Sequence, residues 1–581
     1  MARYDQEDRE DDILGNMVVL GVSLVVIAAV VIGVVAGIDN PKDDHVGTGN
    51  NTTTLDAICA QTEYKESCIS SLQPVGNQSE VIVYFKAAVN ATVSEIALAM
   101  EKLKVDDGTL SDEGERMALQ DCIELLDLCT KELESVNMLV NSSPTLFYND
   151  SVDARSSLSA VITYQRTCRQ GFKEFESTYN MDGVLQRSSE LSSNALAIIY
   201  EHSENDDKKA ESLVPPRRST YELQGGLHDG YPAQMILAGD RKLSQYHSFR
   251  KLGGRAPNAV VAVDGSGQYT SIFAAIHSYP NGHKGRYLIY VKSGVYYENV
   301  IIAKNMPDIF MYGDGLNETI IAGNVMQGGT AYRRATLSVI GEGFFCKDIG
   351  ITVPTQYYGG YTVAAVKVLS DKAAFFNCRI IGTTSSIFAL AHRQFFRNCE
   401  IYGATNIVSG DAALVIQHSD IILTESNLVG KASVIASQAR SDRRESTGFV
   451  IHGCNIYRDK SNNTIDIDQT PQVQSDSTTY LGMAAQKFSR TIVMESSLGD
   501  LIRPEGWYGN PADRNRATEH VTFVEYGNKG PGAQTKMRVN WPGYAFISNR
   551  DDVLRYTAGR FIQAQTWLQG TVVPFQEGFF S

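Results

Sequence analysis

A short pattern that occurs twice between Phe376 and Asp411 limits the possible folds of this 581-residue chain. Phe376-Asn377-Cys378-Arg379-Ile380 returns as Phe396-Arg397-Asn398-Cys399-Glu400-Ile401, so the two cysteines are 21 residues apart. A period near 20 residues, built from short apolar strands and small turn residues, is typical of stacked coils that bury one another's apolar faces. We expect a functional site in the loops between such strands.

The rest of the C-terminal part shows the same alternation of short apolar strands and turn residues. After Ala256, short runs of β-branched and aromatic residues are divided by Gly, Asn and Asp, and helical periodicity is nearly absent. Small side chains recur at corresponding places in successive units, as the inner ladder of a parallel β-helix requires: Cys346, Cys378, Cys399, Ser419, Cys454 and Ser496. We therefore predict a mainly β domain over residues 258–581, with these cysteines in its core rather than as ligands.

The preceding part of the chain is helical. Apolar residues recur at spacings of three and four in four stretches, over residues 81–103, 117–139, 156–179 and 184–199. Four amphipathic helices with short joints predict an all-α four-helix bundle over residues 55–202. Residues 203–257, with charge, paired prolines and glycines, predict a domain linker, and its dibasic pairs are candidate cleavage sites in a secreted precursor.

The N-terminal region predicts a membrane segment. Residues 13–38 carry no charge, and about 20 apolar residues suffice to span a bilayer as a helix. Residues 1–12 form an acidic tail that lacks the basic start of a signal peptide, which favours an uncleaved signal anchor over a cleaved signal. Residues 39–54 are polar and predict a flexible linker. Glycosylation sequons beyond them fit a secretory route: Asn50, Asn51, Asn77, Asn90, Asn141, Asn149, Asn317 and Asn462.

Charge is divided unevenly along the chain. The total of -14 combines -19 for residues 1–243 with +5 for residues 244–581. This asymmetry suggests separate partners or mutual attraction within one precursor, unless the two parts simply reach solubility in unrelated ways. The nine cysteines include no CxxC pattern and the histidines are not clustered, so we expect no metal site, and no nucleic-acid partner is predicted.

Several motifs then point to one family. Five in the C-terminal part resemble plant pectin methylesterases: Val263 to Tyr269, Gly294 to Glu298, Gly313 to Gly315, Arg393 to Arg397 and Trp541 to Tyr544. In the helical part, Cys59 and Cys68 around a short turn, Asp121 to Leu125, and Ser157 to Phe172 resemble the pectin methylesterase inhibitor domain. The resemblance spans nearly everything after residue 50.

The resemblance implies an inhibitor-like four-helix bundle joined to a right-handed parallel β-helix. It implies disulfides Cys59–Cys68 and Cys122–Cys168, which leaves Cys129 without a role. Arg241 and Lys242, within Asp240 to Leu243, are similar to the family's processing site. The implied partners are homogalacturonan, the polymer of pectin, and active pectin methylesterases that the bundle would inhibit.

Members of this family demethylate homogalacturonan without a metal or cofactor. They use an aspartate nucleophile, an aspartate acid/base, two glutamines that stabilise the oxyanion and an arginine that orients the nucleophile. Attack on a methyl ester requires an ionised carboxylate, a proton for the departing methoxide and donors aimed at the developing oxyanion.

Every one of those positions is substituted in this chain. Asn406 stands at the nucleophile and Ser385 at the acid/base, while Thr362 and Thr384 replace the glutamines. Met483 replaces the arginine, and Ala485 replaces an aromatic residue that stacks on sugar. An amide cannot act as a carboxylate nucleophile, and a serine hydroxyl titrates far too high to donate a proton near neutrality.

We therefore predict a catalytically inactive member of the family. Asp411, His392 and Glu400 lie nearby in sequence, but no pair of them reproduces the two-carboxylate arrangement. Two alternatives remain open: a regulatory protein that binds homogalacturonan or inhibits esterases, and a residual or rewired carboxylic ester hydrolase acting on methylated pectin.

Overall fold

The computed structural model describes residues 54–106, 110, 112–142, 151–211, 256–324, 329–354, 363–424, 432–459, 479–509 and 518–580, without the side chains of residues 204–211. Residues 13–38, predicted to span a membrane, and the processing residues Arg241 and Lys242 lie outside these ranges. Residues 53–581 form one compact unit. The predicted domain boundaries therefore stay predictions.

The N-terminal described region is helical, as the periodicity predicted. Two short helices, α2 (Leu55–Cys59) and α3 (Lys65–Leu72), and the 3₁₀ turn η1 (Gln73–Val75) precede four long ones. The long helices are α4 (Val81–Asp106), α5 (Glu113–Ser142), α6 (Ser151–Glu174) and α7 (Met181–Glu211). Each of α4, α5 and α6 buries a stripe of residues in a shared core, the arrangement that amphipathic helices adopt in a bundle.

Helix α4 is the one described helix that is long and apolar enough to cross a membrane. Its buried residues, which include Tyr84, Phe85 and Leu103, instead belong to the bundle core. Disulfides join Cys59 to Cys68 and Cys122 to Cys168, the pairs implied by the family resemblance. Cys129 is a buried free thiol on α5, and its Sγ lies 3.6 Å from the carbonyl oxygen of Val161 on α6.

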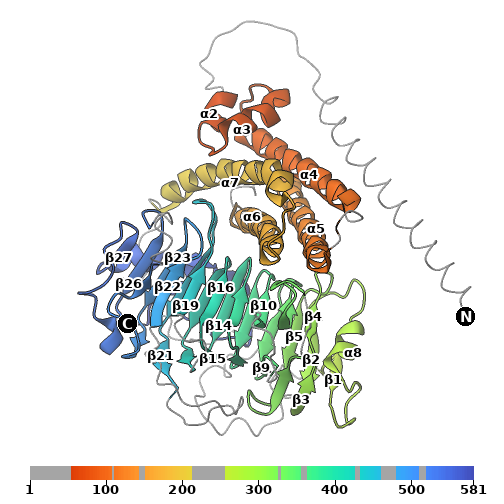
Figure 1. Cartoon of the computed structure of the whole chain (residues 1–581), viewed down its shortest axis with the longest axis vertical. Helices are drawn as coiled ribbons and strands as arrows, with labels where there is room; N and C mark the ends of the chain where they lie inside the picture. Colours follow the sequence, from red (N-terminus) through yellow and green to blue (C-terminus); the bar gives the residue numbers. More distant parts are fainter. Residues whose placement is uncertain are drawn as a thin grey trace, which may run out of the picture. The chain divides into compact units, whose positions relative to one another are not determined.

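The C-terminal region is a parallel β-helix, in which parallel strands stack side by side (Figure 1). Within the described ranges, sheet 1 has eleven strands. They are β1 (Ala259–Val261), β2 (Tyr287–Val291), β5 (Ile309–Tyr312), β8 (Phe345–Lys347), β11 (Ala373–Phe376), β14 (Arg393–Arg397), β17 (Ala413–Gln417), β20 (Gly448–His452), β23 (Arg490–Met494), β26 (Thr522–Tyr526) and β27 (Tyr544–Phe546).

Sheets 2 and 3 each have eight strands in the part of the chain that the structure describes. Sheet 2 contains β4 (Val300–Ile302), β7 (Ala335–Val339), β10 (Ala364–Val368), β13 (Ser385–Ala389), β16 (Asn406–Gly410), β19 (Ser433–Gln438), β22 (Thr479–Ala484) and β25 (Trp507–Tyr508). Sheet 3 contains β3 (Gly294–Tyr297), β6 (Thr319–Ala322), β9 (Gly350–Thr352), β12 (Arg379–Ile381), β15 (Glu400–Gly403), β18 (Asp420–Leu423), β21 (Asn455–Arg458) and β24 (Ser497–Leu498).

Short helices complete the fold. Helix α8 (Ile272–His277) lies between β1 and β2, and its Ser271 cap accepts a hydrogen bond from the amide of Ala274. The turn η6 (Pro531–Ala533) separates β26 from β27. Helices α9 (Arg550–Leu554), α10 (Ala558–Phe561) and α11 (Ala564–Trp567) follow β27, and buried residues of all three pack in one cluster with residues of sheet 1.

The repeated pattern forms one complete coil. Arg379 pairs with Glu400 and Ser385 with Asn406, so strands 21 residues apart lie in register. The aromatic rings of Phe375 and Phe396 stack inside, with their centroids 4.5 Å apart. The spacing that predicted a coil therefore corresponds to one turn of the β-helix.

The predicted ladder of small residues needs one correction. Cys378, Cys399, Ser419, Cys454 and Ser496 each follow a residue with positive φ at the same corner of successive coils. Cys346 does not belong to this set, because it pairs with Phe375 within sheet 1 and Ile349 occupies the corner position of that coil. Cys346 therefore lies three residues before the corner of its coil, which the spacing of the cysteines in the sequence did not indicate.

Candidate functional site

The positions predicted for the acid/base and the nucleophile lie next to each other at the start of two neighbouring strands of sheet 2. Ser385 begins β13, Asn406 begins β16, and the two residues pair directly. The carbonyl oxygen of Thr384 accepts hydrogen bonds from the amide of Asn406 at 3.1 Å and from Oγ1 of Thr405 at 2.9 Å. The structure thus brings together three of the five predicted catalytic positions.

The side chains at these three positions, Thr384, Ser385 and Asn406, are small and neutral. Asn406 is exposed, whereas Ser385 is buried with its Oγ 3.2 Å from Oγ of Ser409. Oγ1 of Thr384 is buried and has no hydrogen-bond partner among the described residues. None of these side chains ionises near neutral pH, so the pair of strands holds neither a carboxylate nucleophile nor a carboxylic acid.

The remaining predicted positions lie farther along or outside the described chain. Met483 on β22 pairs with Ser437 of β19, which pairs with Ser409 of β16, so Met483 is two strands away and in a different row from Asn406. Ala485, directly after β22, is half-buried. Thr362 lies outside the described residues. A thioether at Met483 cannot donate a hydrogen bond to orient a nucleophile.

Two tyrosines lie in sheet 2 beside the substituted positions. Tyr480 pairs with Val434, which pairs with Asn406, so Tyr480 and Asn406 share one row across the sheet. The rings of Tyr480 and Tyr508 meet edge to face with their centroids 5.2 Å apart. Sequence reasoning missed this pair because it considered only the lost aromatic at Ala485.

The nearest carboxylate along the chain, Asp411, follows β16 and is completely buried. It accepts four hydrogen bonds of 2.7 to 2.9 Å, from Thr163, Arg166, Gln438 and Thr447. The first two donors lie on α6 of the bundle, and the other two lie in the β-helix. With its acceptor sites occupied in this way, Asp411 is not placed to attack an ester.

His392 and Glu400, the other residues considered as substitutes, are also engaged. Nε2 of His392 lies 3.3 Å from Oε1 of Glu132 on α5, and that oxygen is 2.6 Å from Nζ of Lys304. Burial alone raises the pKa of Glu132, but His392 and Lys304 outweigh burial and lower that pKa to about 2. Glu400 pairs with Arg379 at 2.6 Å on sheet 3, away from the substituted positions on sheet 2.

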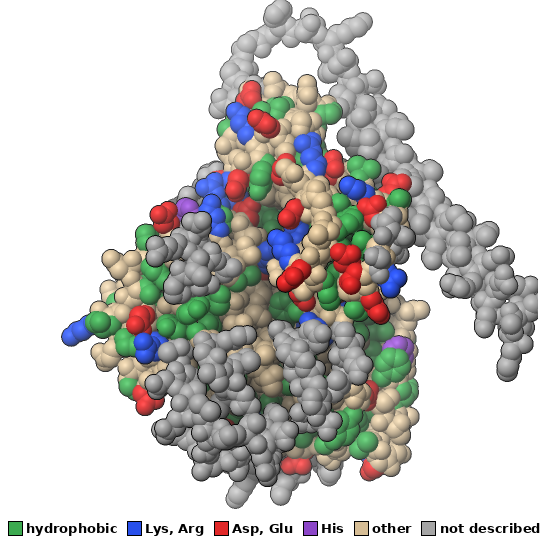
Figure 2. Space-filling model, in the orientation of Figure 1, with side chains coloured by type: hydrophobic (Ala, Val, Ile, Leu, Met, Phe, Trp, Pro, Cys, Tyr) green, Lys and Arg blue, Asp and Glu red, His purple; other side chains and the backbone are tan. Residues whose placement is uncertain are grey.

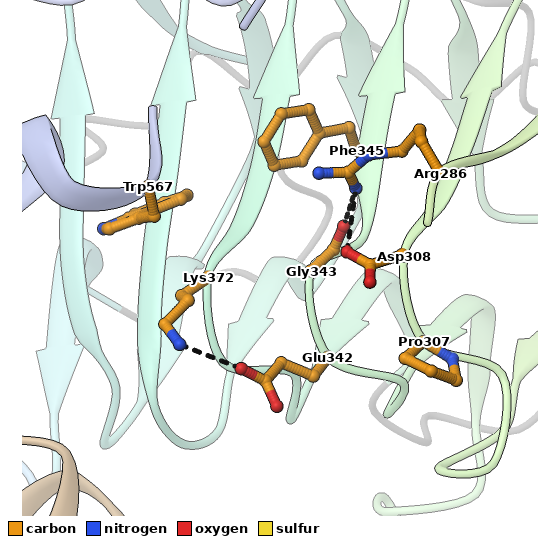
Figure 3. A pocket seen from close by; sticks show the side chains of 8 residues that line it. All are labelled: Arg286, Pro307, Asp308, Glu342, Gly343, Phe345, Lys372 and Trp567. Atoms are coloured by element: carbon orange, nitrogen blue, oxygen red, sulfur yellow. Dashed lines mark hydrogen bonds and ion pairs between the residues drawn. The ribbon is translucent and has the colours of Figure 1, made fainter. Parts of the chain in front are cut away.

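A separate cavity of about 320 Å³ lies at the turns that enter sheet 1 (Figure 3). Its cations already have partners: Nζ of Lys372 is 2.9 Å from Oε1 of Glu342, and Arg286 is close to Asp308 and stacks over Phe345. None of the predicted site residues lines this cavity. No group of three or more potential metal ligands occurs within the described ranges.

The predicted glycosylation sites have mixed surroundings. Asn77, Asn141 and Asn317 are exposed. Asn90 is half-buried, and its Oδ1 accepts a 3.2 Å hydrogen bond from Asn137 on the neighbouring helix α5. Asn50, Asn51, Asn149 and Asn462 lie outside the described residues.

Comparisons with known proteins agree with this architecture. A Pectinesterase family model matches residues 258–565, and a plant invertase/pectin methylesterase inhibitor model matches residues 53–198. The chain is 32% identical to "Probable pectinesterase/pectinesterase inhibitor 23" of Arabidopsis thaliana, over 95% of this chain and 96% of that protein. It is 33% identical to "Pectinesterase 1" of Citrus sinensis, over 94% and 92% respectively. The solved pectin methylesterase from carrot is 36% identical, with a TM-score of 0.52, over 56% of this chain and 98% of that one.

Proposed function

Because the chain belongs to the pectinesterase family and carries the inhibitor-family bundle, we propose that it is a non-catalytic member of the machinery that modifies pectin. The observation that carries the proposal is the pair Ser385 and Asn406. These residues begin β13 and β16, at the positions where the family resemblance implies the two catalytic aspartates, and neither carries a carboxylate. The engaged state of Asp411, His392 and Glu400 supports it further, since none of them is free to take over the role.

Methanol release from highly methylated pectin tests this proposal directly. We expect the full-length chain to release no methanol above background under conditions in which an active plant pectin methylesterase turns over. Each lost transition-state donor costs on the order of 10²- to 10³-fold in rate, and here several are absent together. Turnover at ordinary esterase rates would overturn the proposal, and its survival in Asn406→Ala would show that the reacting group lies elsewhere in the chain.

A rebuilt variant provides the matched positive control. Ser385→Asp, Asn406→Asp, Thr362→Gln, Thr384→Gln and Met483→Arg together restore the side chains that the family resemblance implies. Recovery of methanol release in this variant would show that the scaffold is sound and that the five side chains alone silence it.

Homogalacturonan binding is a second candidate function, which the aromatic pair on sheet 2 favours. Tyr480 lies in the row that contains Asn406 and its ring meets that of Tyr508, so an aromatic face there can stack on a sugar ring. In this role the β-helix holds the polymer without cleaving its esters. The row formed by Ser385, Asn406, Val434 and Tyr480 carries no charged side chain, which favours binding through stacking and hydroxyl contacts rather than through ion pairs.

Retardation of the full chain in gels that contain pectin tests this second candidate. We expect Tyr480→Ala and Tyr508→Ala to reduce the retardation, because each removes a stacking surface. Tyr457→Ala is the matched control, since Tyr457 is an exposed tyrosine on sheet 3. Equal retardation of all three variants would exclude the tyrosine pair as the binding surface.

A secretory route completes the proposal. The uncharged residues 13–38 would anchor the precursor in the membrane, with the rest of the chain on the lumenal side until processing near Arg241 and Lys242. The exposed sequons at Asn77, Asn141 and Asn317 support this orientation. N-terminal sequencing of the secreted form, together with glycosidase treatment, tests both points.

A further inference from the structure

Charged side chains from the helical bundle and the β-helix pair across a common interface. Acidic residues of the bundle face basic residues of the β-helix: Asp121 and Glu124 pair with Arg333, Glu132 with Lys304, Asp153 with Arg393, Glu174 with Arg334, and Glu201 with Arg444. Acidic and basic side chains also lie close together on the face shown in Figure 2. The charge asymmetry of the sequence is therefore expressed, at least in part, as attraction within the chain.

One pair at this interface has the opposite polarity and is buried more deeply. Nη1 of Arg166 on α6 lies 2.9 Å from the completely buried Oδ2 of Asp411 and also donates to the carbonyl oxygen of Ala439. Thr163, one turn earlier on α6, donates to the same carboxylate oxygen. The β-helix thus buries a carboxylate that depends on two donors from the bundle.

Apolar side chains fill the space between these charges. Leu369, Leu390 and Ala391 follow strands of sheet 2, yet they are buried in the same cluster as the bundle core. Tyr332 joins that cluster, and its hydroxyl donates to Glu124 at 2.9 Å. Separating the bundle from the β-helix would expose this apolar surface and leave Asp411 without Thr163 and Arg166.

No disulfide among the described residues connects the bundle to the β-helix. Both disulfides lie within the bundle, and Cys346, Cys378, Cys399 and Cys454 of the β-helix are free. After a break in the connecting segment, any lasting association must therefore be non-covalent.

From these contacts we propose that the helical bundle stays bound to the β-helix permanently. After the linker is cut, the two fragments remain together as one non-covalent complex. Hydrolysis of one linker peptide bond adds a water molecule across that bond and leaves the interface contacts unchanged. The bundle surface that carries Thr163, Arg166 and Glu132 stays covered, so the cut chain does not offer this surface to another esterase.

The test uses the full chain with a recognition site for a sequence-specific protease introduced within residues 212–255. After complete cleavage, denaturing gels show two fragments under both reducing and non-reducing conditions. We expect the two fragments to co-elute on gel filtration at micromolar concentration and moderate salt, with the circular dichroism spectrum of the uncut chain. Two separate, folded peaks would overturn the proposal.

Substitutions then locate the contact that holds the complex. Arg166→Ala leaves the Asp411 carboxylate buried without its cationic partner, and we expect the fragments to dissociate on the order of 100-fold faster. Lys131→Ala is the matched control on α5, since Lys131 pairs with Asp127 where both side chains are about half exposed, and we expect no change. Dissociation rates that are equal for both variants would contradict the role assigned to Asp411.

A double variant separates loss of the contact from loss of the fold. Arg166→Leu with Asp411→Asn removes both charges of this pair, so neither is left buried without the other, and we expect the complex to recover much of its lifetime. A double variant that dissociates as fast as Arg166→Ala would show that burial of the charge is not what determines stability of the complex. Circular dichroism of each uncut variant is recorded first and confirms that the variant is folded before the linker is cut.

Discussion

The two ends of strand β16 differ sharply in charge and surroundings. Asn406, at its first residue, is neutral and exposed, while Asp411, directly after its last residue, is a completely buried carboxylate. The first position carries no carboxylate, and the second has its carboxylate held by four donors from two parts of the chain. The covered end of β16 is therefore followed by a carboxylate with a structural role, whereas its exposed end carries a neutral amide.

The sharpest test of this difference is removal of the buried carboxylate. Asp411→Ala leaves Arg166, Gln438 and the two threonine hydroxyls without their shared acceptor in a buried site. We expect the free energy of unfolding to fall by about 3–5 kcal/mol. Urea denaturation monitored by circular dichroism measures it, and a loss below about 1 kcal/mol would mean that the Asp411 network contributes little.

The second prediction concerns Glu132, on the bundle side of the same interface. Its folded pKa of about 2 lies below the ordinary value of 4.5, so the folded state binds this proton less readily than the unfolded state. The stabilisation is present above about pH 4.5 and is lost as the pH falls toward 2, with a total of roughly 3 kcal/mol.

Urea denaturation between pH 2 and pH 6 measures this contribution. The groups that face Glu132 are Lys304, His392 and the hydroxyl of Ser157. In the variant Glu132→Gln the acid-dependent loss attributed to this carboxylate should be absent. Parallel pH profiles for the two proteins would contradict the assignment.

A smaller effect is expected at the rim of the interface. Asp153 is 41% exposed and pairs with Arg393, which keeps a second partner in Asp371. Because solvent screens the rim pair, Asp153→Ala should cost less than about 1 kcal/mol. A cost as large as that of Asp411→Ala would show that the rim pairs, rather than the buried pair, hold the interface.

The smallest effect is expected at the open end of β16. Asn406→Ala removes an exposed amide whose side chain makes no hydrogen bond among those found in the described residues, so stability should change by less than about 0.5 kcal/mol. Thermal unfolding measures it. A large loss would give Asn406 a structural role and weaken the contrast between the two ends of the strand.

Much of the fold could be predicted from the sequence, because the spacing of apolar residues along the chain indicates which segments are strands and which are helices. The 21-residue repeat around Cys378 and Cys399 set the coil length, and spacings of three and four set the long helices. The placement of Cys346 could not be predicted from a 21-residue spacing, because its coil is longer: Phe375 pairs with Cys346 and Arg379 with Gly350, each 29 residues apart, and Cys346 lies within the strand rather than at the corner.

The candidate site was predicted in part. The repeated motifs around Cys378 and Cys399 lie on consecutive coils and must stack. Ser385 and Asn406, which follow these motifs, could therefore be predicted to lie side by side. The partners of Asp411 could not be found in the same way, since Thr163 and Arg166 lie nearly 250 residues away in sequence. Only the opposite net charges of the two parts of the chain pointed toward that interface.

Methanol release from methylated pectin by the intact full-length chain is the measurement that most directly tests the proposed catalytic inactivity of this site. The measurement should include neutral and mildly acidic pH, with an active plant pectin methylesterase beside it. We predict no release above background at any pH, because Ser385 and Asn406 supply neither a carboxylate nor a titrating acid. Sustained turnover by the purified chain at rates near those of the active enzyme would contradict this account.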